Sequence, residues 1–405
     1  MKGLIKLLLY RAGAAVGILL FSIIAPIYLS DDIVSEVFLI ILYLYLALMF
    51  SKYGVDMLFL KNIPNLSEEE RKIKFTISII FSLLSSFVVG IVFLFIDSFF
   101  LKDSVADDVF FLLPPLTCLV VFSSYLRARE EYFYSSLTDK GTAFLGAAII
   151  FPLLIEVGIS VNLISVLSFI VWALFFMFML YFIKKKELCY FDFSIFDVIK
   201  IGSGGGSFTL LAVLSYLTVW FPAFLIENYS VQDFIDYNLA LRFVAPFTFL
   251  ITTVDLFAST KVTKLVHTSK HHAAKELYLK FVKMFIAIGL FYFTVTVFLA
   301  FFAADSGFFS QQFLFYYITL VGAYVLSSSI GPSGVFLNMY GRVKIVNKIT
   351  LLIGFLGLVA SLVLLQLDMV DMIVFVVSSM LILKSSLQCV SFVKLLNDKV
   401  EKFDC

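Results

Sequence analysis

The sequence predicts an all-α integral membrane protein with about twelve transmembrane helices in two lobes of six. Of its 405 residues, 61% are hydrophobic and 15% are charged, and the mean hydropathy is +1.04. A globular chain usually has about 45–50% apolar and about 25% charged residues. The apolar residues form runs of spanning length, and the charges between the runs alternate in sign. These three observations indicate a polytopic membrane protein.

Each membrane span needs about 20 predominantly apolar residues. The first run starts with basic residues, as a secretory signal does, but it is longer, contains Arg11 and is followed by acidic residues instead of a cleavage site, so we predict that it is retained. The predicted spans are 7–29, 34–59, 75–98, 108–127, 142–160, 162–183, 203–226, 237–258, 283–304, 312–339, 347–367 and 371–393.

The charges between the spans predict the orientation, because cytoplasmic loops carry an excess of Lys and Arg. One set of connections is basic, including residues 61–74, 127–140, 184–200, 261–283 and 342–348. The other set is acidic, with Lys102 as its only basic residue. The basic set is predicted to be cytoplasmic, which places both termini inside the cell.

The composition changes near the middle of the chain, where a basic run, an aromatic and acidic segment and a glycine run follow one another. We predict a lobe at 1–186 with spans 1–6, a cytoplasmic connection at 187–202, a lobe at 203–394 with spans 7–12, and a cytoplasmic tail at 395–405. The GSGGGS run lacks the Lys and Ser/Thr of a P-loop and is expected to be a flexible start of the seventh span. The basic segment 261–283 is expected to be a solvated loop, with attraction to anionic headgroups as the alternative.

A cation lies inside the eighth predicted span. The stretch from Tyr237 to Asp255 is long enough to cross a membrane and carries Arg242 in an otherwise apolar run. A charged side chain in hydrocarbon costs from about 2.5 to more than 10 kcal/mol, so it normally faces a bundle interior or a wet cavity. We predict that Arg242 marks a binding position. The alternative is that it reaches the nearer surface or pairs with a carboxylate.

Arg11 lies about one and a half turns into the first span. If it faces the same cavity as Arg242, the two guanidinium groups would suit a phosphate or diphosphate, which guanidinium binds in a bidentate way. The alternative is that Arg11 only reaches the inner headgroups. Arg242 and Asp255 are about 20 Å apart along a helix and cannot pair with each other.

Two carboxylates, Asp56 and Asp255, are candidates for ion coupling. They lie in the similar stretches VDML and VDLF, each at the end of the second span of its half, and internal repeats of this kind underlie many transporters. Lys52 precedes Asp56 by four residues and predicts a neutralising pair. Ile251 stands at the matching position before Asp255, which makes Asp255 the better candidate, with solvation near the cytoplasmic end as the alternative.

Proline and glycine interrupt two of the spans. Pro246 stands four residues after Arg242, where its ring clashes with the carbonyl of that residue. Gly331, Pro332 and Gly334 form the GPSG break of the tenth span. Such breaks are tolerated where neighbours satisfy the freed backbone groups. We predict hinges at both places, with close packing at small residues as the alternative for GPSG.

The sequence holds no enzyme constellation: it has no GxSxG, no P-loop and no His at catalytic spacing with Ser or Cys. The three His lie in one basic segment, and the four Cys have neither metal-ligand nor disulfide spacing. We therefore expect no enzyme activity, no metal and no cofactor, but coupling of transport to H⁺, Na⁺ or the membrane potential. The net charge of +1 argues against a nucleic-acid partner.

Four segments carry a resemblance to a known family. They are FSKYGVDMLFLKN at 50–62, YLRAREEYF at 125–133, Tyr-x-x-Ala-x-Arg at 237–242 and Asn-Met-x-Gly-x-x-Lys at 338–344. In these segments the chain resembles the Wzx-type or O-antigen flippases of polysaccharide biosynthesis. These belong to the multidrug/oligosaccharidyl-lipid/polysaccharide (MOP) exporter superfamily. The resemblance extends over nearly the whole chain.

The resemblance implies a V-shaped bundle like that of MATE transporters, in the bacterial inner membrane. It implies that an undecaprenyl-diphosphate-linked oligosaccharide, the repeat unit of O-antigen or a related surface polysaccharide such as lipopolysaccharide, is flipped by alternating access. The diphosphate would bind Arg242 and Arg11, and the lipid tail would lie in a lateral groove. The expected partners are this substrate, membrane lipid, a polysaccharide polymerase and a chain-length regulator.

Two other functions remain open. In a MATE-like, cation-coupled multidrug antiporter, a carboxylate such as Asp255 would dominate and Arg242 would be dispensable. In a non-transporting component of a polysaccharide assembly complex, both Arg242 and Arg11 could be neutralised without loss of export.

Overall fold

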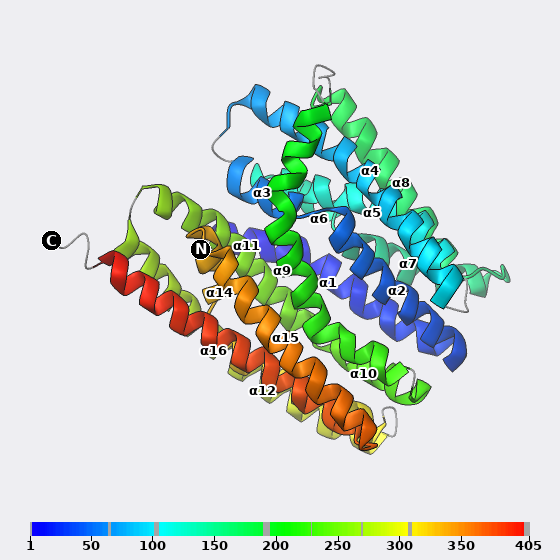
Figure 1. Cartoon of the computed structure of the whole chain (residues 1–405). Coiled ribbons are helices and arrows are strands. Elements are labelled where there is room, and N and C mark those ends of the chain that lie inside the picture. Colours follow the sequence, from blue (N-terminus) through cyan, green and yellow to red (C-terminus); the bar gives the residue numbers. More distant parts are fainter. Residues whose placement is uncertain are drawn as a thin grey trace. The chain divides into compact units, whose positions relative to one another are not determined.

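The computed structural model describes residues 2–63, 66–100, 105–188, 195–227, 229–268, 270–306 and 310–400. This part of the chain is built from helices and contains no strand, which confirms the predicted all-α fold (Figure 1). Contacts between residues divide the chain into two compact units, Met1–Val213 (unit 1) and Leu214–Cys405 (unit 2).

Unit 1 contains eight helices and the beginning of a ninth among its described residues. They are α1 (Lys2–Tyr28), α2 (Asp31–Ser51), α3 (Val55–Asn62), α4 (Glu68–Phe100), α5 (Val105–Ala128), α6 (Tyr132–Leu137), α7 (Lys140–Glu156), α8 (Leu163–Lys184) and α9 (Ile195–Glu227).

Helix α5 forms the centre of unit 1. It packs against α2, α3, α4, α6 and α8, and most of its side chains are buried, including those of Pro114 and Pro115. Aromatic side chains fill the space around its second half. The ring of Tyr125 stacks on Phe75 of α4 with centroids 3.9 Å apart, and Phe182 of α8 packs against both rings.

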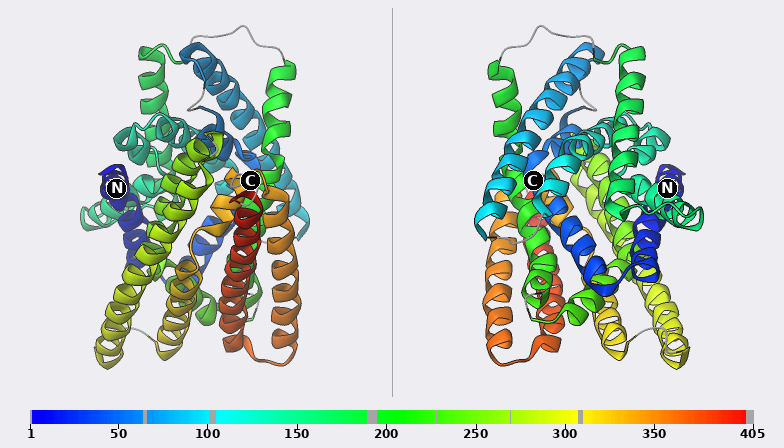
Figure 2. Two further views of the ribbon diagram at one scale, coloured as in Figure 1. Left: turned by 90° about the vertical axis from the view of Figure 1, so that its left-hand side faces the viewer. Right: turned by 90° about the vertical axis from the view of Figure 1, so that its right-hand side faces the viewer.

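Unit 2 contains the rest of α9 and the helices that follow it. They are α10 (Val231–Phe243), α11 (Ala245–His267), α12 (His271–Ser306), α13 (Gln311–Ser329), α14 (Ser333–Met339), α15 (Val343–Gln366), the short 3-10 helix η2 (Val370–Met372) and α16 (Ile373–Val400). Helix α13 packs against α10, α12 and α16, and α15 packs along α16; Figure 2 shows these last two helices side by side in orange and red.

The predicted spans correspond to helices. Within the described residues, nine helices are long and apolar enough to cross a membrane, and two bent pairs raise this number to as many as eleven. The remaining predicted span, the fifth at 142–160, corresponds to α7, which has 17 residues. The prediction of about twelve helices therefore agrees with the structure, and only α7 is short for a span.

Several helices begin at polar side chains that cap them. Asp139 accepts a hydrogen bond from the amide of Gly141 at the start of α7, and Ser230 and Ser310 cap α10 and α13 in the same manner. Such caps satisfy amide groups that have no partner within the helix. They explain why the helices start where the polar connections end.

Three predicted spans, the second, the eighth and the tenth, are each divided into two helices. The breaks of the eighth and tenth spans agree with the predictions at Pro246 and GPSG, and the break of the second span corrects the prediction of a continuous segment. The second span ends as α2 at Ser51, and after a turn of three residues α3 begins at Val55. The eighth span is α10 and α11, which meet at Val244 with a bend of 46°. The turn after α2 contains Tyr53 and Gly54 in the left-handed region, with φ of 44° and 69°.

The glycine run is helical, which corrects the prediction of a flexible start of the seventh span. Gly204, Gly205 and Gly206 lie within α9. A Cβ atom on Gly205 would lie 1.8 Å from the carbonyl oxygen of Tyr53, and one on Gly54 would lie 2.5 Å from the carbonyl oxygen of Gly205. The glycines therefore allow α9 to pack directly on the turn between α2 and α3.

The same contact affects the boundary between the units. The start of the second lobe at residue 203 stays a prediction, and the compact units meet at 213 and 214, within α9. The first part of α9 belongs to unit 1 because its glycines fit the turn at Tyr53.

The basic segment 261–283 is also mostly helical, which corrects the prediction of a solvated loop. Helix α11 continues to His267, and α12 begins at His271. The exposed side chains of this segment include Lys261, Lys264 and Lys270. The positive charges of this segment therefore lie at the end of α11 and the start of α12.

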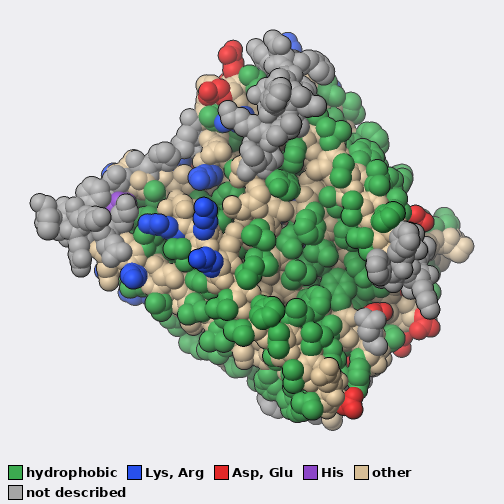
Figure 3. Space-filling model, viewed as in Figure 1, with side chains coloured by type: hydrophobic (Ala, Val, Ile, Leu, Met, Phe, Trp, Pro, Cys, Tyr) green, Lys and Arg blue, Asp and Glu red, His purple; other side chains and the backbone are tan. Residues whose placement is uncertain are grey.

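Hydrophobic side chains cover much of the molecular face drawn in Figure 3. Exposed large hydrophobic side chains are numerous on α4, α8, α12 and α15, for example Phe95, Phe169, Phe291 and Phe355. Soluble monomers rarely expose apolar surface on this scale. These helices are therefore suited to contact hydrocarbon.

Candidate functional site

Arg242 lies in the last turn of α10, next to the bend between α10 and α11. Its side chain is only 3% exposed. The helix ends at Phe243 because Pro246, in the first turn of α11, has no amide hydrogen for the ladder. The predicted kink after Arg242 is therefore present, two residues before the proline.

The side chain of Tyr292 stabilises this bend. Its hydroxyl, on α12, donates a hydrogen bond of 3.2 Å to the carbonyl oxygen of Phe243. Its ring also stacks on Phe247 of α11, with centroids 5.0 Å apart. Helix α12 thus satisfies a carbonyl group that the break leaves without a helical partner.

Arg11 of α1 forms an ion pair with Asp139. Nη2 of Arg11 donates to Oδ2 of Asp139 at 3.1 Å, and both side chains are 12% exposed. The pair forms because α1 and α7 cross at very short range. A Cβ atom on Gly141 would lie 2.2 Å from the carbonyl oxygen of Ala14, and one on Gly17 would meet the carbonyl oxygen of Gly141 at the same distance.

Asp139 is held in its charged form. Burial raises the pKa of its carboxyl, but Arg11, Arg127 and the amide of Gly141 outweigh burial, so the pKa lies below its ordinary value. The expectation that Arg11 binds a diphosphate stays a prediction. Its charge is already balanced by a carboxylate that the sequence analysis did not identify as its partner.

The predicted pair of Lys52 and Asp56 is confirmed. Nζ of Lys52 lies 2.7 Å from Oδ2 of Asp56. The two residues do not share one helix, however, since Lys52 follows α2 and Asp56 is in the first turn of α3. The tight turn at Tyr53 and Gly54 brings them together instead.

Asp255 on α11 has a charged partner that the sequence did not suggest. Lys384 of α16 interacts with it electrostatically, although no hydrogen bond or ion pair within 4 Å joins them. Oδ1 of Asp255 is buried and accepts no hydrogen bond from any described residue. The sequence analysis considered only neighbours on the same helix and missed a partner 129 positions away.

The GPSG segment forms the break between α13 and α14, which are bent by 46°. Gly331 has φ of 93°, and a Cβ atom there would lie 2.6 Å from Val282. A Cβ atom on Gly334 would lie 2.6 Å from Oε1 of Gln388. Tyr278 of α12 donates a hydrogen bond of 2.5 Å to the carbonyl oxygen of Ile330. The break is thus tightly packed, and its role as a hinge stays a prediction.

Glu187 is a buried charged residue that sequence reasoning placed in the cytoplasmic connection. It is 4% exposed, accepts a hydrogen bond of 2.8 Å from the hydroxyl of Tyr125, and pairs with Arg129. Burial lowers the pKa of Arg129, but the hydrogen bonds to Glu187 and Tyr125 raise it above its ordinary value. These contacts join the end of α8 to the end of α5.

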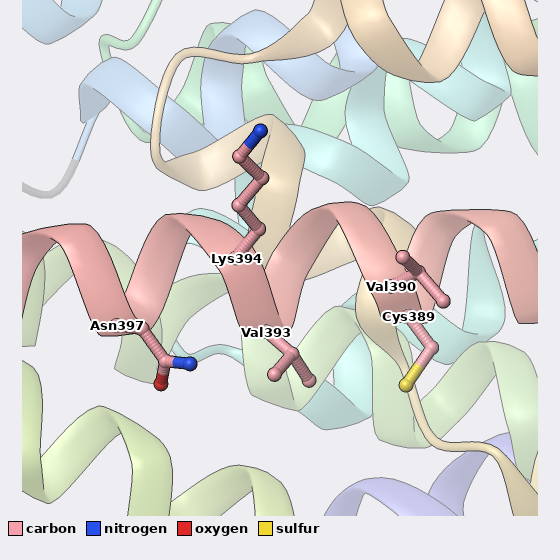
Figure 4. A pocket seen from close by; sticks show the side chains of 5 residues that line it. All are labelled: Cys389, Val390, Val393, Lys394 and Asn397. Carbon is pink, nitrogen blue, oxygen red and sulfur yellow. The ribbon is translucent and has the colours of Figure 1, made fainter.

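Unit 2 carries two open grooves on α16. One, with a volume of about 480 Å³, lies between α15 and α16 and is lined almost wholly by apolar side chains such as Leu356, Phe375 and Met380. The other, about 440 Å³, has Cys389, Val390, Val393, Lys394 and Asn397 on its wall; Figure 4 shows the Lys394 and Cys389 side chains leaving α16 in different directions.

Comparison with known proteins identifies the fold. No family model matches the chain, and no curated protein matches it. Several solved structures, however, match the chain over nearly its whole length. The outward-facing multidrug resistance MATE family transporter of the MOP superfamily is 12% identical, with 99% of this chain and 96% of that chain covered and a TM-score of 0.71. The Vibrio cholerae MATE transporter VcmN in its bent form is 11% identical, with 98% and 97% covered and a TM-score of 0.70.

A third match is a MOP superfamily transporter from Pyrococcus furiosus, described as having a binding pocket of reverse polarity that suggests a different function. It is 12% identical, with 98% of this chain and 99% of that chain covered and a TM-score of 0.62. The protein thus shares the multi-helix fold of these solved membrane transporters. More narrowly, it has the fold of the MATE transporters of the MOP superfamily.

Proposed function

We propose that the protein is a lipid-linked oligosaccharide flippase. It would move an undecaprenyl-diphosphate-linked polysaccharide repeat unit across the bacterial inner membrane by alternating access. The proposal joins the fold shared with MATE transporters to the four Wzx-like segments of the sequence. We further propose that a polysaccharide polymerase and a chain-length regulator are partners of the protein.

The observation that carries the proposal is the burial of Arg242. A guanidinium group that is 3% exposed inside a predicted span is costly to maintain, and it binds diphosphate well because its donors form a planar fork. A carrier of cationic drugs has no evident use for a cation at this position. In our proposal Arg242 binds the diphosphate, with Arg11 as a further contact.

Other features support parts of the same proposal. The Pyrococcus furiosus transporter of similar fold is described by the reverse polarity of its pocket, and a cationic binding position in this chain would be a reversal of the same kind. The apolar groove between α15 and α16 offers a surface for a hydrocarbon tail. The breaks at Val244 and at Gly331–Pro332 supply bends that alternating access could use.

Replacement of Arg242 by Ala tests the proposal in cells that depend on this protein for a surface polysaccharide. We expect export to fall at least tenfold, because the charge that balances the diphosphate is lost, with the protein present at its normal level. Arg242→Lys keeps the positive charge but lacks the planar fork of donors. Its export should therefore lie between that of Arg242→Ala and that of the unaltered protein. Arg342→Ala is the matched control, since Arg342 is exposed at the start of α15, and should export normally. Normal export by Arg242→Ala would contradict the proposal.

A second candidate function is a cation-coupled multidrug antiporter, since structures of similar fold include a multidrug resistance transporter. The observation that favours it is Asp255, whose buried Oδ1 accepts no hydrogen bond within the described part of the chain. Under this function Asp255→Asn would make cells susceptible to cationic dyes, and Arg242→Ala would not. Loss of polysaccharide export without any change in dye susceptibility would favour the flippase.

A further inference from the structure

We propose that the groove on the C-terminal half of α16 is a binding site for an anionic phospholipid. Neither the predicted site residues nor the proposed function include its side chains. Such a site would operate whether or not Arg242 binds a diphosphate. The groove has a volume of about 440 Å³ and is lined by Cys389, Val390, Val393, Lys394 and Asn397.

The residues that line the groove form two adjacent stripes on α16. Cys389, Val393 and Asn397 recur every four residues, and Lys394 follows Val390 by the same step. Side chains at this spacing lie one above another along a helix. Figure 4 shows Cys389, Val393 and Asn397 leaving one side of α16 and Lys394 leaving another. Because a free thiol behaves as a small hydrophobic group, each stripe changes from apolar to polar toward the C-terminal end of the helix.

The change in polarity falls at the predicted inner boundary of the membrane. The twelfth predicted span ends at residue 393, and the basic connections predict that this end of the helix is cytoplasmic. Val390, which is 67% exposed, lies within the span, and exposed Lys394 and Asn397 lie just beyond it. The groove therefore offers apolar surface at the depth of acyl chains and polar groups at the depth of headgroups. A phospholipid of the inner leaflet has the same order of parts.

Charge favours an anionic headgroup over a zwitterionic one. Lysine binds phosphate as a compact charge on a flexible stem, and none of the five lining residues is acidic. The groove therefore has no carboxylate for the ammonium group of a zwitterionic lipid. Glu276 is the only carboxylate of segments 261–283 and 342–348, and basic clusters beside a membrane attract anionic lipids. Exposed cations of these two segments include Lys270, Lys275, Lys280, Arg342, Lys344 and Lys348.

Contacts on the buried side of α16 hold the groove in place. Phe392 is fully buried, and its ring packs against Tyr278 of α12 and Phe336 of α14, with centroids 4.9 Å and 5.1 Å away. The thiol of Cys389 lies 3.3 Å from the hydroxyl of Tyr278. These contacts fix the rotation of α16 about its axis, so that the two stripes stay exposed. A preorganised groove loses little freedom when it binds a ligand.

The experiment measures which lipid lies beside the groove in a bilayer. The full-length chain is placed in vesicles of equal parts phosphatidylglycerol and phosphatidylcholine, with brominated acyl chains on one lipid or the other. The four native cysteines are replaced by Ser, and Leu387→Cys carries a bimane label. Leu387 is 40% exposed and lies about one turn deeper than Val390 without lining the groove. We expect brominated phosphatidylglycerol to quench this label at least twofold more than brominated phosphatidylcholine.

Two controls separate the groove from the rest of the basic surface. A label on Leu352→Cys of α15, where Leu352 is 53% exposed, lies at a similar depth in its predicted span and should be quenched equally by the two lipids. Lys394→Gln should remove the preference for phosphatidylglycerol at the Leu387→Cys label. Lys348→Gln removes an exposed cation that does not line the groove and should keep that preference.

A second pair of variants keeps the test decisive if Lys394→Gln does not fold. Asn397→Asp has nearly the shape of the native amide but adds a carboxylate three residues after Lys394, where the two can pair. We expect this variant to lose the preference for phosphatidylglycerol at the Leu387→Cys label. Asn397→Gln lengthens the amide without adding charge and should keep the preference.

A preference for phosphatidylglycerol that is confined to the Leu387→Cys label and depends on Lys394 supports the site. Three results would overturn the proposal. The first is equal quenching of the Leu387→Cys label by the two lipids. The second is the same preference at Leu352→Cys, which would mean that anionic lipid gathers around unit 2 without using the groove. The third is a preference that persists in Lys394→Gln, or in Asn397→Asp if Lys394→Gln does not fold.

Discussion

Positively charged side chains in the interior of this protein differ in how their charge is balanced. Arg11 has a carboxylate partner in Asp139, and Lys52 has one in Asp56. Arg127 donates hydrogen bonds to the hydroxyl groups of Ser123 and Ser135 and interacts electrostatically with Asp139 and Asp56. Because a buried ion pair largely cancels its own field, Arg11 is a weaker anion contact than its position in the sequence suggests. Arg242, which is 3% exposed, is the better subject for binding experiments.

Acid should weaken the junction between α1 and α7 through Asp139. The pKa of this carboxyl is lower in the folded protein than the value near 3.9 of an unfolded chain. Its contribution to stability is therefore complete above about pH 5 and disappears as the pH falls through the lower, folded-state pKa. We expect Asp139→Asn to lower the melting temperature at pH 7 and to flatten its decline between pH 5 and pH 3, as measured in detergent. If the melting temperature of Asp139→Asn falls with acid as steeply as that of the unaltered protein, other carboxylates cause the fall.

Asp255 and Lys384 should be coupled in stability. The two side chains interact electrostatically without an ion pair within 4 Å, so removal of either charge should cost less than the about 3–5 kcal/mol that is lost when a fully buried ion pair is broken. We expect Lys384→Met and Asp255→Asn each to lower the melting temperature by several degrees. The double variant should be at least as stable as the less stable of the two single variants. Additive losses in the double variant would mean that the two side chains do not interact.

Close backbone contact determines the course of several helices. Glycines at the crossing of α1 and α7 and at the contact of α9 with the turn after α2 leave no space for a Cβ atom. Where a helix breaks, a tyrosine of α12 supplies the missing hydrogen bond: Tyr292 at Phe243 and Tyr278 at Ile330. The bends of unit 2 are thus stabilised by one neighbouring helix.

The glycine run of α9 provides a matched pair of substitutions. A Cβ atom on Gly205 would overlap the carbonyl oxygen of Tyr53 at 1.8 Å, whereas one on Gly204 would make an ordinary contact of 3.5 Å with Leu58. Gly205→Ala should therefore cost about 1–3 kcal/mol or more. Gly204→Ala should be neutral or stabilising by up to about 1 kcal/mol, since Ala is the better helix former. Equal melting temperatures for the two variants would contradict the close packing of Gly205 on Tyr53.

Tyr278 should contribute measurably to the break between α13 and α14. Its hydroxyl donates to the carbonyl oxygen of Ile330. Tyr278→Phe removes only this oxygen and should destabilise the protein by about 0.5–1.5 kcal/mol, the usual contribution of a hydrogen bond. Tyr10→Phe on exposed Tyr10 is the control. Hydrogen exchange at the amides of α14 should rise in Tyr278→Phe and stay constant in the control.

At the scale of the whole molecule, hydropathy alone was sufficient to predict the fold class. Each predicted span has a helix or a bent pair of helices in the structure. A run of about 20 apolar residues has the length of a helix that crosses the bilayer, so it predicts such a helix well. Pro246 and the GPSG segment also predicted where helices break. Local chemistry of this kind can be read from neighbouring residues.

The charged sites could be predicted only in part, because their partners lie far away in the sequence. Lys52 and Asp56 are four residues apart and were recognised, but Asp139 lies 128 positions from Arg11. The helical glycine run was missed for a related reason: in isolation such a run favours disorder, whereas in the structure it lies within α9 and packs against Tyr53. Tertiary packing overrides local preference at these places.

The predicted orientation can be tested over the whole chain with introduced cysteines. In a background with the four native cysteines replaced by Ser, we expect Asp32→Cys and Asp371→Cys to react with an impermeant maleimide on spheroplasts. Lys270→Cys and Arg342→Cys should react only after the membrane is opened. All four side chains are exposed in the structure. Labelling of Lys270→Cys on intact spheroplasts would reverse the predicted topology.

The short length of α7 has a consequence for the lipids around it. Its 17 residues extend for about 26 Å at 1.5 Å per residue, which is less than the roughly 30 Å of bilayer hydrocarbon. A spanning helix of this length leaves a hydrophobic mismatch, which acyl chains relieve by local thinning at a cost of a fraction of a kcal/mol per ångström. The membrane beside α7 should therefore be thinner than elsewhere around the protein.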